Sequence, residues 1–184
     1  VEDFKGLKMR IPGLAAEVLN RMGGTAVALP GGEIMPSLQS GAIDATEWIG
    51  PWNDLAFGFY KITKFYYGPG FHEPSSVLEC GINLESYNQL ENDLKKIVQI
   101  ACEAENSRML SEFTAANIDA QQKLVNMHGV KINNFPKDVF KLMMKLSSDV
   151  VAETADEGKI NKEIYESWST FKKNARLRSP YAEQ

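Results

Sequence analysis

The sequence lacks several features that would assign it to common functional classes. No apolar run among its 184 residues approaches the roughly 20 residues that a membrane-spanning helix needs, so we expect no part of it to enter a bilayer. The net charge is −4 and the basic residues are dispersed, which argues against binding of a nucleic-acid backbone. Only two histidines and two cysteines are present, which leaves few groups for metal or nucleophilic catalysis.

The few histidines and cysteines also lack catalytic spacing. Cys80 and Cys102 lie in apolar segments without a CxxC pair, so we expect buried small side chains rather than zinc ligands or redox groups. His128 closes a predicted helix, where the helix dipole favours a cation. His72, beside Glu73, is more typical of a surface or packing residue, although it is also the one candidate general base. We therefore expect no enzyme.

Alternating and helical patterns predict an α/β fold. Residues 7–11 and 25–29 alternate as strands do, and residues 14–22 between them have helical spacing and stop at a glycine pair. A strand, a helix and a strand in so short a stretch predict a parallel unit with a right-handed crossover. A helix over residues 33–40 then leads into a strand that ends at Glu47 and Trp48.

The middle of the chain is punctuated by glycine and proline. We expect one or two helical turns over residues 51–62 and a loop over residues 66–74, in which Tyr66 and Tyr67 serve packing. Residues 75–83 have the pattern of another strand.

The second half of the chain is mostly helical. Residues 90–127 carry an apolar stripe along one predicted helix of about 50 Å, long enough to brace two lobes. A short strand over 130–132, a helix after Pro136 and a last helix after Gly158 complete the pattern. The fold class is thus α/β, with a mixed sheet, a long bracing helix and C-terminal helices.

One arginine and two acids at the ends of predicted elements form the strongest candidate site. Arg10 suits a carboxylate, because its planar guanidinium makes two parallel charge-assisted hydrogen bonds. Glu47 and Glu73 would repel an anionic ligand unless a cation lay between them, and oxygen ligands suit sodium or calcium. These residues could equally form surface salt bridges, Glu47 could be a solvated strand-end acid, and Trp48 could serve packing.

The motifs resemble those of one family over essentially the whole chain. They are GLKMRI at residues 6–11, GGEIMPSLQSGAIDATEWIGP at 31–51, FGFY at 57–60 and YYGPGFHE at 66–73. Together they resemble the solute-binding proteins of TRAP transporters, and within that family the branch that binds 2-oxo acids. The resemblance implies a two-lobed periplasmic protein that closes over an organic acid and delivers it to a sodium-driven membrane permease.

The resemblance also implies a role for each candidate residue. Arg10 matches the arginine that grips the substrate carboxylate. Glu47, the main-chain oxygen of Trp48, and Glu73 match the ligands of a sodium or calcium ion that bridges protein and substrate. Sialic acid and dicarboxylate members commonly carry asparagine where Trp48 stands, which favours a small 2-oxo acid such as pyruvate. A C4-dicarboxylate, lactate or a sugar acid bound without metal is the alternative, followed by a metal-dependent enzyme acting on 2-oxo acids.

Such proteins also have a first lobe that this sequence largely lacks. Residues 1–73 then correspond to the second α/β lobe, and residues 74–184 to a crossing strand, the long inter-lobe helix and the C-terminal helical part. A lobe without its usual neighbour exposes apolar surface, so we expect this chain to form a homodimer that covers it.

Overall fold

The computed structural model describes residues 1–73, 76 and 78–179. Contacts divide the chain into two compact units. Unit 1 contains Val1–Thr46 together with the chain from Phe135 onward, and unit 2 contains Glu47–Asn134. The predicted boundary between residues 73 and 74 stays a prediction. Within the described chain, no helix has both the length and the apolar character needed to cross a membrane.

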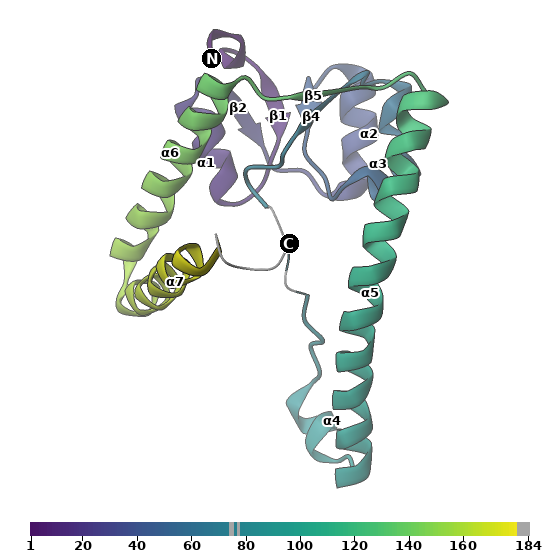
Figure 1. The fold of residues 1–184 in the computed structure, drawn as a ribbon, viewed down its shortest axis with the longest axis vertical. Coiled ribbons are helices and arrows are strands. Elements are labelled where there is room, and N and C mark those ends of the chain that lie inside the picture. The colour runs from purple at the N-terminus through teal and green to yellow at the C-terminus, as the bar shows by residue number, and fades with distance from the viewer. Residues whose placement is uncertain (74–75, 77, 180–184) are drawn as a thin grey trace. The chain divides into compact units, whose positions relative to one another are not determined.

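Unit 1 is built on a three-stranded parallel sheet. Strands β1 (Lys8–Arg10), β2 (Thr25–Val27) and β3 (Ala45–Thr46) pair in the order β2-β1-β3. Figure 1 shows β1 and β2 side by side. Helices α1 (Leu14–Arg21) and α2 (Gly31–Ser40) join consecutive strands. Parallel strands need such crossover helices, and the predicted order of elements is confirmed.

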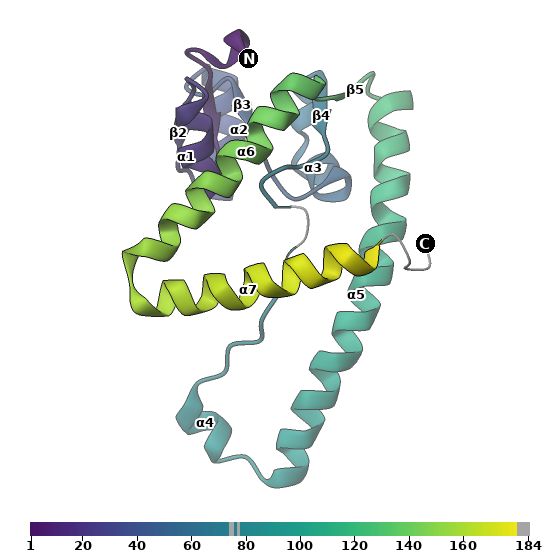
Figure 2. The same cartoon turned by 60° about the vertical axis from the view of Figure 1, so that its left-hand side comes forward.

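Two C-terminal helices complete unit 1. Helix α6 (Lys137–Thr154) packs against α1, and the Arg21 guanidinium donates to both carboxylate oxygens of Glu153 at 2.8 and 2.6 Å. A short turn connects α6 to α7 (Lys159–Arg178), where the chain changes direction sharply (Figure 2). Burial of aliphatic side chains drives this packing at about 2 kcal/mol each. The buried apolar side chains of unit 1 include Ile11, Val18, Leu19, Ile34, Leu38, Ile43, Val139, Met143 and Val150.

Unit 2 contains the longest helix. Helix α5 (Asn92–Asn126) has 35 residues and is therefore about 50 Å long, as predicted. Helix α3 (Pro51–Phe57) packs on it, with the ring centroids of Trp52 and Phe113 4.9 Å apart. The main-chain N–H of Trp52 donates to Asn117 Oδ1 at 3.0 Å, so a residue of α5 satisfies an otherwise open donor at the start of α3.

A second, two-stranded sheet lies in the same unit. Strand β4 (Phe65–Gly68) pairs in parallel with β5 (Lys131–Asn134). Beside it, the Tyr60 ring stacks on His128 with centroids 3.7 Å apart. The short helix α4 (Leu84–Asn88) precedes α5. The described strands thus form two small parallel sheets, and the expectation of one mixed sheet was wrong.

Three further expectations were wrong. Tyr66 and Tyr67 belong to strand β4 rather than to a loop, because pairing with β5 supplies hydrogen bonds that local sequence does not reveal. In the segment predicted as a strand at 75–83, the described residues 76 and 78–83 form neither helix nor strand, and residues 75 and 77 lie outside the described chain. Cys80 and Cys102 are exposed rather than buried.

Candidate functional site

The predicted carboxylate-binding residue Arg10 lies at the carboxyl end of β1. Arg10 ends β1 and pairs in register with Thr46, the last residue of β3, and Glu47 is the next residue along the chain. The carboxyl ends of parallel strands are a common position for ligand-binding groups. Arg10 is half-buried, and its Nε donates to the main-chain oxygen of Leu29 at 3.1 Å. That bond helps to fix the direction of the guanidinium.

Glu47 is a nearly buried carboxylate at the start of unit 2. Its side chain is only 8% exposed, and Oε2 lies 3.1 Å from Nε2 of His72, whose side chain is 15% exposed. A carboxylate removed from water to this extent needs hydrogen-bond donors or positive charge nearby. The alternative that Glu47 is a solvated acid at the end of a strand is therefore wrong.

Trp48 directly follows Glu47 in the sequence, and Glu73 directly follows His72. The Trp48 indole packs against Phe57, with ring centroids 4.9 Å apart, so the packing role considered for its side chain is present. Glu73 is exposed.

A buried acid that sequence reasoning missed lies near Glu47. Asp54 on α3 is 7% exposed, and its Oδ2 accepts a hydrogen bond of 2.5 Å from the Tyr66 hydroxyl. Burial raises the pKa of Asp54 to about 6, the Tyr66 hydrogen bond opposes this, and the charge of Glu47 adds to the increase. Burial and the Asp54 carboxylate together raise the pKa of Tyr66 as well. No local motif marked Asp54, since its partner comes from a distant strand.

The donor set fits a hard cation better than a softer metal. Two buried carboxylates, Glu47 and Asp54, place negative charge in the same region of unit 2, where a cation would be stabilised. Among the described residues, no group of three His, Cys, Asp or Glu side chains is arranged to hold a metal ion. A metal bound here would therefore need main-chain and ligand oxygens beside the carboxylates, which is typical of sodium and calcium.

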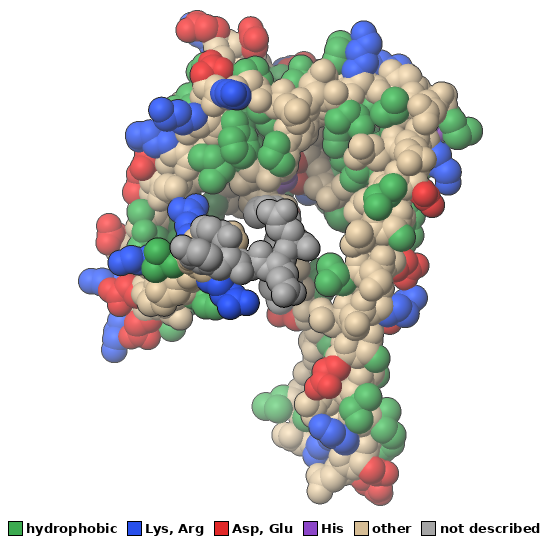
Figure 3. Space-filling view, in the orientation of Figure 1, with side chains coloured by type: hydrophobic (Ala, Val, Ile, Leu, Met, Phe, Trp, Pro, Cys, Tyr) green, Lys and Arg blue, Asp and Glu red, His purple; other side chains and the backbone are tan. Residues whose placement is uncertain are grey.

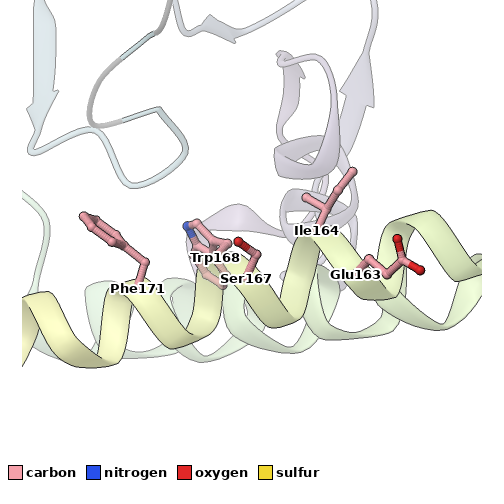
Figure 4. Close-up of a pocket in the computed structure, with 5 residues that line it drawn as sticks. All are labelled: Glu163, Ile164, Ser167, Trp168 and Phe171. Carbon is pink, nitrogen blue, oxygen red and sulfur yellow. The ribbon is translucent and has the colours of Figure 1, made fainter.

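Two surface depressions are lined by other residues. One depression on α7 is lined by Glu163, Ile164, Ser167, Trp168 and Phe171 (Figure 4). Another lies between α3 and α5 and is lined by residues that include Trp52, Ala120 and Lys123. Neither depression includes Arg10 or Glu47 in its lining. We therefore assign the candidate site from side-chain chemistry rather than from concavity.

Comparison with known proteins identifies the family. Residues 1–157 match the model of the bacterial extracellular solute-binding protein family 7. The chain is 39% identical over 173 residues to a monocarboxylate 2-oxoacid-binding periplasmic protein of Nostoc sp. (strain PCC 7120), and the match covers 94% of the chain and 47% of that protein. The chain thus spans about half the length of the curated relatives that it matches.

Two solved structures share the fold closely. A TRAP periplasmic solute-binding protein from Colwellia psychrerythraea, with bound calcium and pyruvate, has a TM-score of 0.89 and 36% identity, over 98% of this chain and 55% of its own. A second from Pseudoalteromonas atlantica T6c, with bound sodium and pyruvate, has a TM-score of 0.86 and 35% identity, over the same shares of the two chains. These findings confirm the fold class, the family resemblance and the periplasmic location that the sequence suggested. The chain belongs to the bacterial extracellular solute-binding protein family 7, the periplasmic solute-binding proteins of TRAP transporters.

Proposed function

We propose that this chain is part of a solute-binding protein that captures a small 2-oxo acid, such as pyruvate, as a carboxylate paired with sodium or calcium. The intact protein then delivers the acid to the TRAP membrane permease. The observation that carries the proposal is the nearly buried Glu47 carboxylate, which lies within electrostatic reach of a second buried acid, Asp54. Two such acids favour a cation, and a cation allows an anionic substrate to bind beside them.

Each residue has a distinct proposed role. Arg10 binds the substrate carboxylate, and Glu47, the main-chain oxygen of Trp48, and Glu73 coordinate the metal. His72 holds the Glu47 carboxylate through the 3.1 Å contact and thereby orients it toward the ion. The ligands bound in the two similar structures, pyruvate with calcium or with sodium, support this assignment by homology.

Other functions make different demands on these residues. A C4-dicarboxylate, lactate or a sugar acid bound without metal would use Arg10 but would not need Glu47 as an ion ligand. A metal-dependent enzyme would need a general base, for which His72 is the candidate. That histidine already contacts Glu47, and the family is one of solute-binding proteins, so we propose binding without turnover.

A thermal-melt titration separates these functions. Pyruvate, longer 2-oxo acids and C4-dicarboxylates are added with calcium, with sodium or with a chelator, to this chain and to a chain extended to the length of its relatives. A ligand at 100 times its dissociation constant stabilises the folded state by about 2.7 kcal/mol. We expect stabilisation only when a 2-oxo acid and a cation are both present. The 184-residue chain should bind more weakly, because lobe closure adds contacts and excludes water.

Two variants provide the matched control. Glu47→Gln removes the proposed ligand charge, whereas Glu79→Gln removes an exposed charge in the same unit. We expect Glu47→Gln to abolish the cation-dependent stabilisation and Glu79→Gln to retain it. Stabilisation by a dicarboxylate or sugar acid in the presence of chelator would refute the metal-paired site, and consumption of pyruvate would support an enzyme.

We also propose that two copies of this chain associate. Hydrophobic side chains are visible on the molecular surface in Figure 3. On α7, the exposed fractions are 63% for Ile160, 62% for Ile164 and 72% for Phe171. Exposed large apolar side chains on one helix favour association. Sedimentation equilibrium tests the proposal, and a monomer at all accessible concentrations would contradict it.

A further inference from the structure

A side-chain hydrogen bond in unit 2 joins the neighbours of the two segments that carry the proposed ion ligands. Residues 47–48 lie just before α3, and residues 72–73 lie shortly after β4. The hydroxyl of Tyr66, in β4, donates to Oδ2 of Asp54, in α3, at 2.5 Å. The bond therefore holds the helix that follows one ligand segment to the strand that precedes the other.

Helix α3 is attached firmly to the first ligand segment. The segment leads directly into the helix, and the main-chain N–H of Asp54 donates to the main-chain oxygen of Gly50 at 2.9 Å. The Trp48 ring packs on Phe57, the last residue of the helix, with ring centroids 4.9 Å apart. A displacement of α3 would thus displace the segment before it, including the main-chain oxygen of Trp48.

Strand β4 fixes the start of the second ligand segment. Its residues Phe65–Gly68 pair in register with Lys131–Asn134 of β5. His72 follows a short way along the chain, and its Nε2 lies 3.1 Å from Oε2 of Glu47. The stretch from β4 to His72 is therefore held by the sheet at one end and by Glu47 at the other.

The bond between Tyr66 and Asp54 is of a strong kind. Asp54 is almost fully buried and Tyr66 is half-buried. With a pKa of about 6, the Asp54 carboxyl is ionised at neutral pH, and a hydroxyl that donates to a carboxylate forms a short, charge-assisted bond. Burial of the charge itself costs free energy. A contribution to stability alone therefore does not account for an acid at this position, whereas a role in positioning does.

We propose that Asp54 and Tyr66 are positioning residues that set the distance between the two ligand segments. The inference rests on the proposed carboxylate and metal site and adds two residues that act on it through their neighbours. The contact of His72 with Glu47 and the bond of Tyr66 with Asp54 join the same two parts of unit 2. Two such contacts fix an orientation that a single contact leaves free to rotate, and an ion is bound tightly only where its ligands are held in place.

Tyr66→Phe removes the bond but keeps the aromatic ring and the charge of Asp54. Calcium is titrated, with pyruvate in excess, into the chain extended to the length of its relatives, and binding is measured by calorimetry. Loss of a residue that orients a metal ligand typically lowers metal affinity by about 10- to 100-fold, so we expect the dissociation constant for calcium to rise at least about tenfold. The matched control is Tyr87→Phe, which removes a hydroxyl from α4 in the same unit and should bind as wild type does.

A double-mutant cycle shows whether the two residues act through their mutual bond. Asp54→Ala and the double variant Asp54→Ala/Tyr66→Phe are titrated in the same way. In the absence of the Asp54 carboxylate the Tyr66 hydroxyl has lost its acceptor, so Tyr66→Phe should then change the dissociation constant by less than about twofold. A tenfold effect of Tyr66→Phe in both backgrounds would show that the hydroxyl acts independently of Asp54 and would overturn the proposal.

Nuclear magnetic resonance of the histidine side chains tests the positioning without any ligand. The 184-residue sequence has two histidines, so their ring nitrogen signals can be assigned readily. His72 contacts Glu47, whereas the ring of His128 stacks on Tyr60 elsewhere in unit 2. In Tyr66→Phe, we expect the signals of His72 to shift and those of His128 to stay in place.

Three further results would each overturn the proposal. They are a wild-type affinity for calcium in Tyr66→Phe, His72 signals that do not move, and a shift of both histidines, which would indicate a general rearrangement of unit 2. Failure of the proposed function would look different. The wild-type protein would then not bind pyruvate with calcium, whereas the His72 signals would still respond to Tyr66→Phe.

Discussion

Replacement of Asp54 by asparagine should change how the stability of the protein depends on pH. Burial raises the pKa of this carboxyl from its ordinary value of 3.8 to about 6 in the folded state. The folded state therefore binds more protons than the unfolded state between these two values, and stability contributed by this group decreases as pH rises through that window. The cost of the ionised, buried carboxylate is fully present above pH 6 and is relieved below pH 4.

The magnitude follows from the change in pKa. A tenfold change in an equilibrium constant corresponds to about 1.4 kcal/mol, so a pKa raised from 3.8 to about 6 corresponds to about 3 kcal/mol. Asp54→Asn has no carboxyl to titrate, yet its side-chain oxygen can still accept the Tyr66 hydroxyl. We therefore expect the free energy of unfolding of this variant, relative to that of wild type, to increase by about 3 kcal/mol as the pH is raised from 4 to 7.

Urea unfolding of both proteins at several pH values measures this difference. The matched control is Asp119→Asn, which removes an exposed carboxylate from α5 in the same unit and should keep the wild-type pH profile. Metal ions are removed throughout, so that binding does not contribute. Parallel profiles for wild type and Asp54→Asn over this range would refute the assignment of a buried, destabilised carboxylate.

Three other substitutions test a core side chain, a hydrogen bond and a left-handed backbone position. Ile43→Ala, at a side chain 2% exposed just before β3, should cost about 3 kcal/mol in urea unfolding, and a loss below about 1 kcal/mol would contradict its place in the core. Asn117→Ala leaves the Trp52 main-chain N–H without its acceptor and should cost about 1 to 2 kcal/mol, whereas exposed Asn92→Ala should change little. Gly41→Ala places a side chain at φ 73°, where space is open but the left-handed backbone is not favoured, and should cost about 1 kcal/mol. An unchanged unfolding midpoint for Gly41→Ala would show that the backbone relaxes.

Much of the helical structure could be predicted because its signals are local. Apolar spacing and terminal glycines or prolines located α1, α2, α5 and α6 to within a few residues. Pairing of β4 with β5 joins residues more than sixty positions apart, as Phe65 with Lys131, so glycine and proline nearby suggested a loop instead. Local composition also placed Cys80 and Cys102 inside, although burial depends on which surface another element covers.

The sequence by itself determined the family, the order of the main elements and the residue types of the site. Arg10, Glu47, Trp48 and Glu73 were chosen because their chemistry and their motif positions are readable without coordinates, and their roles stay proposals. Only the tertiary structure decided that His72 contacts Glu47 across 25 positions and that Tyr66 binds Asp54 across 12. The physical reason is that burial and neighbouring charge, which set the energy of a carboxylate, come from residues that only folding brings together.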